Sequence, residues 1–94
     1  MLEEGKKVII TVVGYDKVGI IATISAVLSN VQINILEISQ TILQGFFTMV
    51  MVVDISNSKL DIVEVKDALT AKGEELQVQI TVQHEDIFRF MHRI

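Results

Sequence analysis

The sequence of 94 residues contains no cysteine, which excludes disulfide bonds and metal sites built on thiolates. A reducing cytoplasm is the simplest compartment for such a chain, so we expect a cytoplasmic protein. Tryptophan is absent and only 5% of the residues are aromatic, whereas 50% are hydrophobic. This composition predicts one folded domain over residues 1–94, with a core of aliphatic side chains.

Positive charge is also scarce. The formal net charge is -4 and the lysines are scattered, so we expect no nucleic-acid partner. The N-terminal residues 1–5 are acidic and do not resemble a signal peptide. Residues 18–36 carry no charge, but their Ser, Thr, Asn and Gln residues fit a helix followed by a strand. A membrane span needs roughly 20 mostly apolar residues in one helix, so we expect no membrane association.

Motifs for catalysis are missing as well. The chain has no cysteine nucleophile and no Gly-x-Ser-x-Gly elbow. Gly14 and Gly19 have the spacing of a phosphate loop, but Ile20 and Ile21 stand where that loop needs Lys and Ser or Thr. We therefore predict a protein that is not an enzyme, with no catalytic residues and no cofactor.

Hydrophobic spacing predicts the order strand–helix–strand–strand–helix–strand. We expect strands over residues 7–15, 33–43, 46–55 and 76–83, a hairpin turn at 44–45, and helices over 19–30 and from about 58 to 73. Ser58 and Asp61 resemble a capping box, and Gly73 is expected to end the second helix. The order predicts an α+β, ferredoxin-like βαββαβ sandwich: a four-stranded antiparallel sheet, two helices on one face, and a short C-terminal helix over 85–94.

Two predicted strands, 7–15 and 46–55, are apolar on both faces, and such strands are normally covered on both faces. The outer side of the first helix carries Thr23, Ala26, Ser29 and Asn30 and no charge. Monomers rarely expose large apolar patches, so we expect a homodimer.

The segment Gly14–Ile21 joins an apolar strand to an apolar helix through a short loop. A helix start presents unpaired N–H groups and favours a small anion such as a carboxylate. Gly19 permits close approach to a ligand, and Asp16 suits either a ligand's ammonium group or a helix cap. A capped helix after a tight turn needs the same two residue types, so both interpretations stand.

These residues carry a family resemblance. The run Val12–Ala22 resembles the first strand, loop and helix of an ACT domain, and Asn34–Thr41 resembles its second strand. With its tail beginning at His84–Phe88, the chain resembles small stand-alone ACT proteins. It is more distantly similar to the ACT modules of the glycine cleavage repressor and of formyltetrahydrofolate deformylase.

The resemblance implies a module that responds to amino acids, pairs with another subunit, and binds its ligand at the interface. The implied ligand-binding residues are Asp16, Lys17, Val18, Gly19 and Ile20 in the loop, faced by Asn34 and Ile35 from the partner subunit. The family often has proline where this chain has Val18, which implies a less rigid loop and a changed affinity. Asn34 also suits a purely structural role at the start of a strand.

His84, Glu85 and Asp86 form the one cluster that resembles a metal or acid–base site. Residues adjacent in sequence seldom converge on one ion, and an acid at the start of a tail helix is explained by capping. We therefore predict no metal.

Two functions remain open from the sequence. The first is a regulatory ACT protein that binds an amino acid or a related metabolite as a homodimer and signals to an effector protein. The second is an adaptor that binds no ligand and docks a transcription regulator or an enzyme through the first helix and the tail with Phe88.

Overall fold

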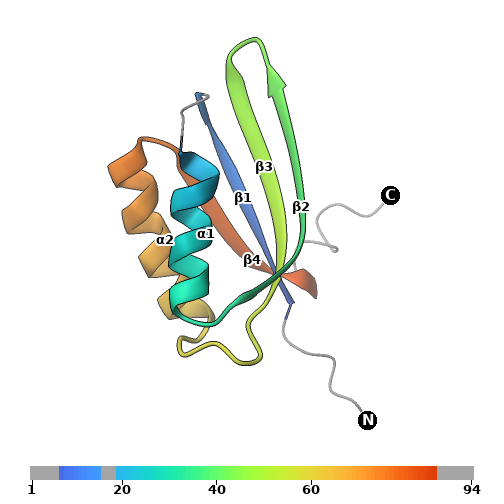
Figure 1. Ribbon diagram of the computed structural model, residues 1–94, viewed down its shortest axis with the longest axis vertical. Helices are drawn as coiled ribbons and strands as arrows, with labels where there is room; N and C mark the ends of the chain where they lie inside the picture. The colour runs from blue at the N-terminus through green and yellow to red at the C-terminus, as the bar shows by residue number, and fades with distance from the viewer. Residues whose placement is uncertain (1–6, 16–18, 87–94) are drawn as a thin grey trace.

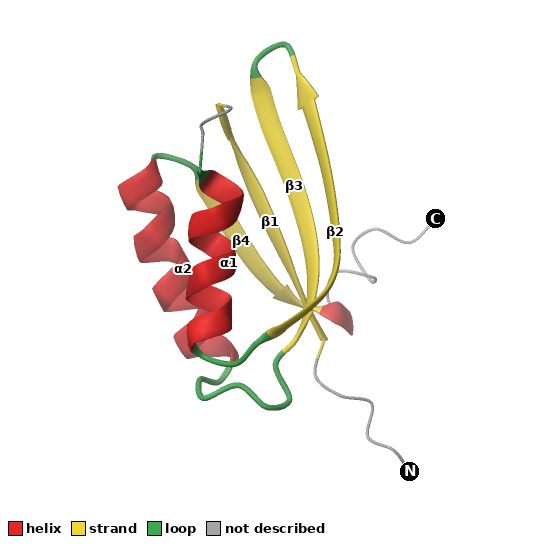
Figure 2. Cartoon of the chain, in the orientation of Figure 1, coloured by secondary structure: helices red, strands yellow, loops and turns green. Residues whose placement is uncertain are grey.

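The computed structural model describes residues 7–15 and 19–86 (Figure 1). In chain order the elements are β1 (Lys7–Tyr15), α1 (Ile20–Asn30), β2 (Asn34–Leu43), β3 (Phe46–Asp54), α2 (Ile62–Leu76) and β4 (Gln79–His84). The strands form one antiparallel sheet in the order β2-β3-β1-β4. Both helices lie on the same side of that sheet (Figure 2). The predicted ferredoxin-like fold is confirmed.

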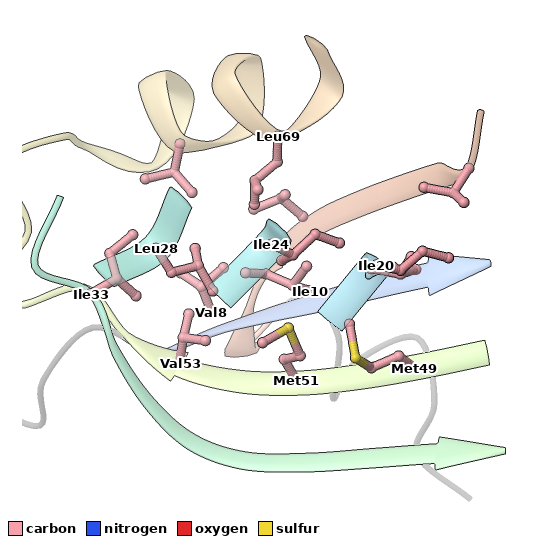
Figure 3. Close-up of a cluster of buried hydrophobic side chains, with 14 of the residues drawn as sticks. Val8, Ile10, Ile20, Ile24, Leu28, Ile33, Met49, Met51, Val53 and Leu69 are labelled. Atoms are coloured by element: carbon pink, nitrogen blue, oxygen red, sulfur yellow. The ribbon is translucent and has the colours of Figure 1, made fainter. Parts of the chain in front are cut away.

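The core lies between the helices and the sheet. Side chains alternate along β1, so Val8, Ile10 and Val12 point toward the helices and are fully buried. Figure 3 shows how these side chains pack between the sheet and the helices, with labels on Val8, Ile10, Met49, Met51 and Val53 from the sheet and on Ile20, Ile24, Leu28 and Leu69 from the helices. This helix side of β3 comprises Phe47, Met49, Met51 and Val53, all buried. The predicted aliphatic core is therefore present, with two methionines at its centre.

Neither α1 nor α2 lies over the opposite side of the sheet, which we call the open face. It consists of Ile9, Thr11, Val13 and Tyr15 of β1, the neighbouring β3 residues Phe46, Thr48, Val50 and Val52, and the alternate residues of β2 and β4. Val13, Tyr15 and Phe46 are among the large apolar side chains that stay exposed. The structure thus retains the second apolar face that the sequence predicted for β1 and β3.

The boundaries of α2 differ from the prediction at both ends. Its capping box is made by Asp61 and Glu64, because each side chain accepts a hydrogen bond from the other residue's backbone N–H. Ser58 instead accepts from the backbone N–H of Leu60, so its predicted capping box is wrong. Gly73 does not end the helix, which continues to Leu76 before Gln77 adopts a left-handed conformation.

The last strand begins at Gln79, three residues later than predicted, because α2 extends into the expected strand. It ends at His84, which pairs with Val8 of β1. The predicted C-terminal helix over residues 85–94 falls almost entirely on residues 87–94, which lie outside the described part of the chain.

Candidate functional site

The start of α1 is open to an approaching group. Gly19 is the N-cap residue, with φ of 92°, a left-handed conformation that suits glycine. Its carbonyl oxygen accepts from the backbone N–H of Thr23 over 2.9 Å, which begins the helix. Gly19 has no side chain to cap the helix, and the first turn of α1 contains no acidic residue. The first N–H groups of α1 therefore carry no carboxylate from within that turn.

The start of α2 provides a contrast within the same molecule. There the carboxylates of Asp61 and Glu64 satisfy the first backbone N–H groups over 2.9 and 3.0 Å. Carboxylates are the groups that a helix start favours, through its N–H groups and its dipole. One helix of this fold therefore supplies its own anion, whereas the first turn of the other does not.

A hollow of about 390 Å³ lies beside the start of α1. Its lining comes from three elements and is mainly apolar: Gly19, Ile20, Ile21 and Ala22 at the start of α1, Gln40 and Ile42 on β2, and Phe47 on β3. Gln40 pairs with Met49 and Ile42 with Phe47, which places both on the helix side of the sheet. The hollow thus combines a helix start without a side-chain cap from the described residues, one amide side chain and an apolar floor, a combination that suits a small ligand with a charged end.

The predicted loop residues lie only partly within the described structure. Asp16, Lys17 and Val18 fall outside it, so their predicted roles stay predictions. Gly19 is exposed and lines the hollow. Ile20 also lines it, but its side chain is only 2% exposed and packs into the core, so this residue offers a ligand mainly its backbone.

Asn34 and Ile35 lie at the other end of the sheet. Asn34 pairs with Asp54, and Asp54 pairs with Lys7, so Asn34 lies level with the start of β1. Gly19 comes shortly after Tyr15, where β1 ends. The length of β1 from Lys7 to Tyr15 is about 26 Å at the usual rise per residue. Within one subunit the structure does not bring Asn34 and Ile35 to the start of α1, so their predicted contact with the loop requires a second subunit.

Gln40, Ile42 and Phe47 were not among the site residues predicted from the sequence. Their position follows from the hairpin turn at Gln44-Gly45, which pairs Leu43 with Phe46 and so carries the end of β2 toward the end of β1. That register was available in the sequence, because the turn length fixes hairpin pairing.

His84 lies at the opposite end from Gly19. Its Nδ1 accepts from the backbone N–H of Asp86 over 3.1 Å and lies 3.8 Å from the Asp86 carboxylate. Within residues 7–15 and 19–86, no three His, Asp or Glu side chains come together as a group able to hold a metal ion. None of the helices in this part of the chain is long and apolar enough to cross a membrane.

Comparison with known proteins identifies the family. A model of the ACT domain matches residues 6–83, which include every strand but for the last residue of β4. The chain belongs to the ACT domain family. A UPF0237 protein of Methanocaldococcus jannaschii is 54% identical over 88 residues, covering 94% of this chain and 98% of that protein. An ACT domain protein from Streptococcus pneumoniae has a structure that matches with a TM-score of 0.79 at 42% identity, over 90% of this chain and 96% of the other.

More distant structures share the fold alone. A formyltetrahydrofolate deformylase from Pseudomonas syringae matches with a TM-score of 0.80 at 21% identity, over 87% of this chain and 28% of that protein. A glycine cleavage system transcriptional repressor matches with a TM-score of 0.73, also at 21% identity, over 87% of this chain and 47% of the other. The two predicted distant likenesses are thus confirmed at the level of the ACT fold. ACT domains are generally regulatory modules for small molecules.

Proposed function

We propose that this ACT protein is a regulator that binds an amino acid or a related carboxylate metabolite in the hollow at the start of α1. One observation carries the proposal: the first turn of α1 lacks a capping carboxylate and borders a hollow, whereas α2 caps itself. The ligand's carboxylate would take the N–H groups after Gly19, and the Gln40 amide would hydrogen-bond its polar end. Asp16, Lys17 and Val18, which precede Gly19 in the sequence, remain predicted ligand-binding residues.

The same proposal includes a homodimer formed by β2. This strand is an edge of the sheet, ten residues long, with Leu36, Ile38 and Ile42 exposed and Glu37 its one charged residue. Long apolar edge strands tend to pair with another strand. An antiparallel pairing of two β2 strands would extend the sheet across a two-fold axis and satisfy both edges.

Such pairing would bring the missing predicted residues to the hollow. The bulge between Ile35 and Glu37 leaves Ile35, Ile38, Gln40 and Ile42 on the helix side. With Ile38 or Ser39 at the two-fold axis, Ile35 of the partner subunit lies opposite Gln40 or Ile42. Asn34 of the partner subunit is then its neighbour in the strand, at the rim of the hollow, with its side chain on the open-face side like that of its register partner Asp54.

A thermal-shift screen against the twenty amino acids and simple one-carbon metabolites tests the proposal. A ligand at a hundredfold excess over Kd stabilises the native state by about 2.7 kcal/mol, which is easily detected. Loss of the shift in both Asp16→Ala and Asn34→Ala, with the fold retained, would support the site. No shift from any compound at millimolar concentration would contradict ligand sensing and leave the adaptor function.

Ala22 offers a sharper variant, because it is exposed, lines the hollow and lies in the first turn of α1. Ala22→Glu places a carboxylate where the ligand's carboxylate would bind, so we expect binding to be abolished while the folded protein is slightly stabilised. Ala22→Gln has the same size without the charge and should retain binding. Ala26→Glu, one turn further along the exposed side, should bind as the unaltered protein does. Equal binding by all three variants would exclude this hollow.

The adaptor function keeps one supporting observation, the uncharged outer surface of α1 with exposed Ala22, Ala26 and Ser29. Under that function Ala26→Glu, or a charge at Phe88, would disrupt capture of the partner protein, whereas Asp16→Ala and Asn34→Ala would have little effect. The Ala26→Glu variant therefore separates the two functions.

A further inference from the structure

The two walls of the hollow at the start of α1 carry no charge. Helix α1 contains no acidic or basic residue along its whole length. Across the hollow, β2 is an edge strand that lies to one side of both helices (Figure 1), and its helix-side residues Ile38, Gln40 and Ile42 stay exposed. Glu37, the one charged residue of β2, pairs with Val52 and so belongs to the open face. A ligand in the hollow therefore meets no charged side chain on either of these walls.

Gln40 supplies the one polar side chain among the described residues that line the hollow. It stands two residues from Ile42 on the same side of β2, about 7 Å along the strand, so the two side chains are neighbours. The Gln40 amide is exposed and makes no hydrogen bond within residues 7–15 and 19–86. An amide offers both a donor and an acceptor but no charge. Gln40 can therefore bind a hydroxyl or an amide of a ligand, but it cannot neutralise a charged group.

We propose that the hollow selects amino acids with uncharged side chains and that Gln40 is its specificity-determining residue. This inference rests on the proposed function, in which the ligand's carboxylate binds the first N–H groups of α1. The ligand's side chain then lies over Ile42 and Phe47, and its far end meets Gln40.

The cost of burying a charge gives the selection its direction. A charged side chain in the hollow would lose hydration against Ile42 and Phe47 without gaining a counter-charge from α1 or β2, which is unfavourable. An uncharged side chain loses little hydration and buries apolar area on Ile42, which is 55% exposed in the absence of ligand. Where that side chain ends in a hydroxyl or an amide, it also gains a hydrogen bond from Gln40.

Amino acids of equal shape and different charge test the selection. Asparagine and aspartate form one such pair, glutamine and glutamate another, and norleucine and lysine have side chains of similar length. In titration calorimetry of the full chain with the twenty amino acids and norleucine, the tightest ligand should have an uncharged side chain. The uncharged member of each pair should bind about tenfold or more tightly than the charged one. A charged side chain on the tightest ligand would overturn the selection and leave the proposed function standing.

Gln40→Glu tests the residue itself. The change keeps the shape of the side chain and places a negative charge beside the hollow, and the fold should tolerate it because Gln40 is exposed. The affinity for lysine relative to norleucine should rise about tenfold or more, since a carboxylate can pair with the ammonium group. Gln79→Glu is the matched control, because Gln79 is exposed on β4, the opposite edge strand, and pairs with Val13 of the open face. It should leave the ratio unchanged.

The outcomes separate this inference from the proposed function. Binding of no amino acid by the unaltered protein would remove both. Binding of an uncharged amino acid, with the same ratio of lysine to norleucine affinity in Gln40→Glu and Gln79→Glu, would remove Gln40 as the specificity-determining residue and keep the proposed function. A rise in the ratio for Gln40→Glu alone would place the ligand's side chain beside Gln40.

Discussion

The backbones of Gly73 and Val78 lie in direct contact where α2 turns into β4. The N–H of Val78 donates to the carbonyl oxygen of Gly73 over 2.9 Å. A Cβ atom at position 73 would lie 2.9 Å from the carbonyl oxygen of Val78 and 3.1 Å from the side chain of Ile80. Only glycine allows the last turn of α2 to approach β4 this closely, so Gly73 serves as a contact point inside the helix and not as its end.

Gly73→Ala should therefore destabilise the protein by about 1–3 kcal/mol, the usual cost of overpacking a core. An alanine in a helix interior normally gains up to about 1 kcal/mol over glycine, so the sign separates steric contact from helix propensity. Urea unfolding measures the change. Ala71→Gly, at an exposed position of the same helix, is the control and should lose about 1 kcal/mol through propensity alone. A gain in stability for Gly73→Ala would contradict the close contact.

The second prediction concerns the start of α2. Asp61→Ala removes the side-chain acceptor for the Glu64 N–H but keeps the backbone N–H that donates to the Glu64 carboxylate, so the free energy of unfolding should fall by about 1 kcal/mol. Ser58→Ala removes only the bond from the Leu60 N–H in the preceding turn and should cost less. Thermal unfolding of both variants gives the comparison. The reverse ranking would restore the capping box predicted at Ser58.

The third prediction concerns two aromatic rings at the exposed end of the open face. Tyr15 and Phe46 are register partners, and their rings stack with centroids 4.9 Å apart and an interplanar angle of 22°. A double-mutant cycle of Tyr15→Leu and Phe46→Leu should give a coupling free energy of about 0.5–1.5 kcal/mol, as for other aromatic pairs. Strictly additive effects would exclude a stabilising stack.

The fold was predictable because local and long-range patterns in the sequence agree. The alternation in β1, the helical spacing of Ile20, Ile24 and Leu28, and the Gln44-Gly45 turn each predict one element, and together they admit one topology. The end of α2 was not predictable from such rules. Gly73 resembles a helix stop when only its neighbours in sequence are considered. Its role depends on close contact with Val78 and Ile80, which only the folded chain shows.

The candidate site was predicted in part. Gly19 follows from the loop chemistry alone, and the structure bears out its place at the start of α1. Gln40 and Ile42 were missed because their relation to Gly19 depends on how β2 is folded back on β3, not on nearby residues. Asn34 and Ile35 were predicted from the family resemblance. Within a single subunit they lie at the end of the sheet away from Gly19.

The last prediction concerns the β2 edge, on which the proposed pairing of subunits depends. Ile38 is 41% exposed on the helix side of β2, near the middle of the strand. Ile38→Lys would place two like charges close together at the centre of the paired strands, so the dimer should dissociate at concentrations where the unaltered protein stays paired. Sedimentation velocity over a dilution series measures this. Val63→Lys makes a similar change at an exposed apolar site on α2 and should leave the dimer intact. Since Ile35 of the partner subunit would complete the hollow, with Asn34 beside it at the rim, Ile38→Lys should also weaken ligand binding, although Ile38 does not line the hollow. A variant that dissociates but binds ligand with unchanged affinity would place the whole site within one subunit and remove Asn34 from it.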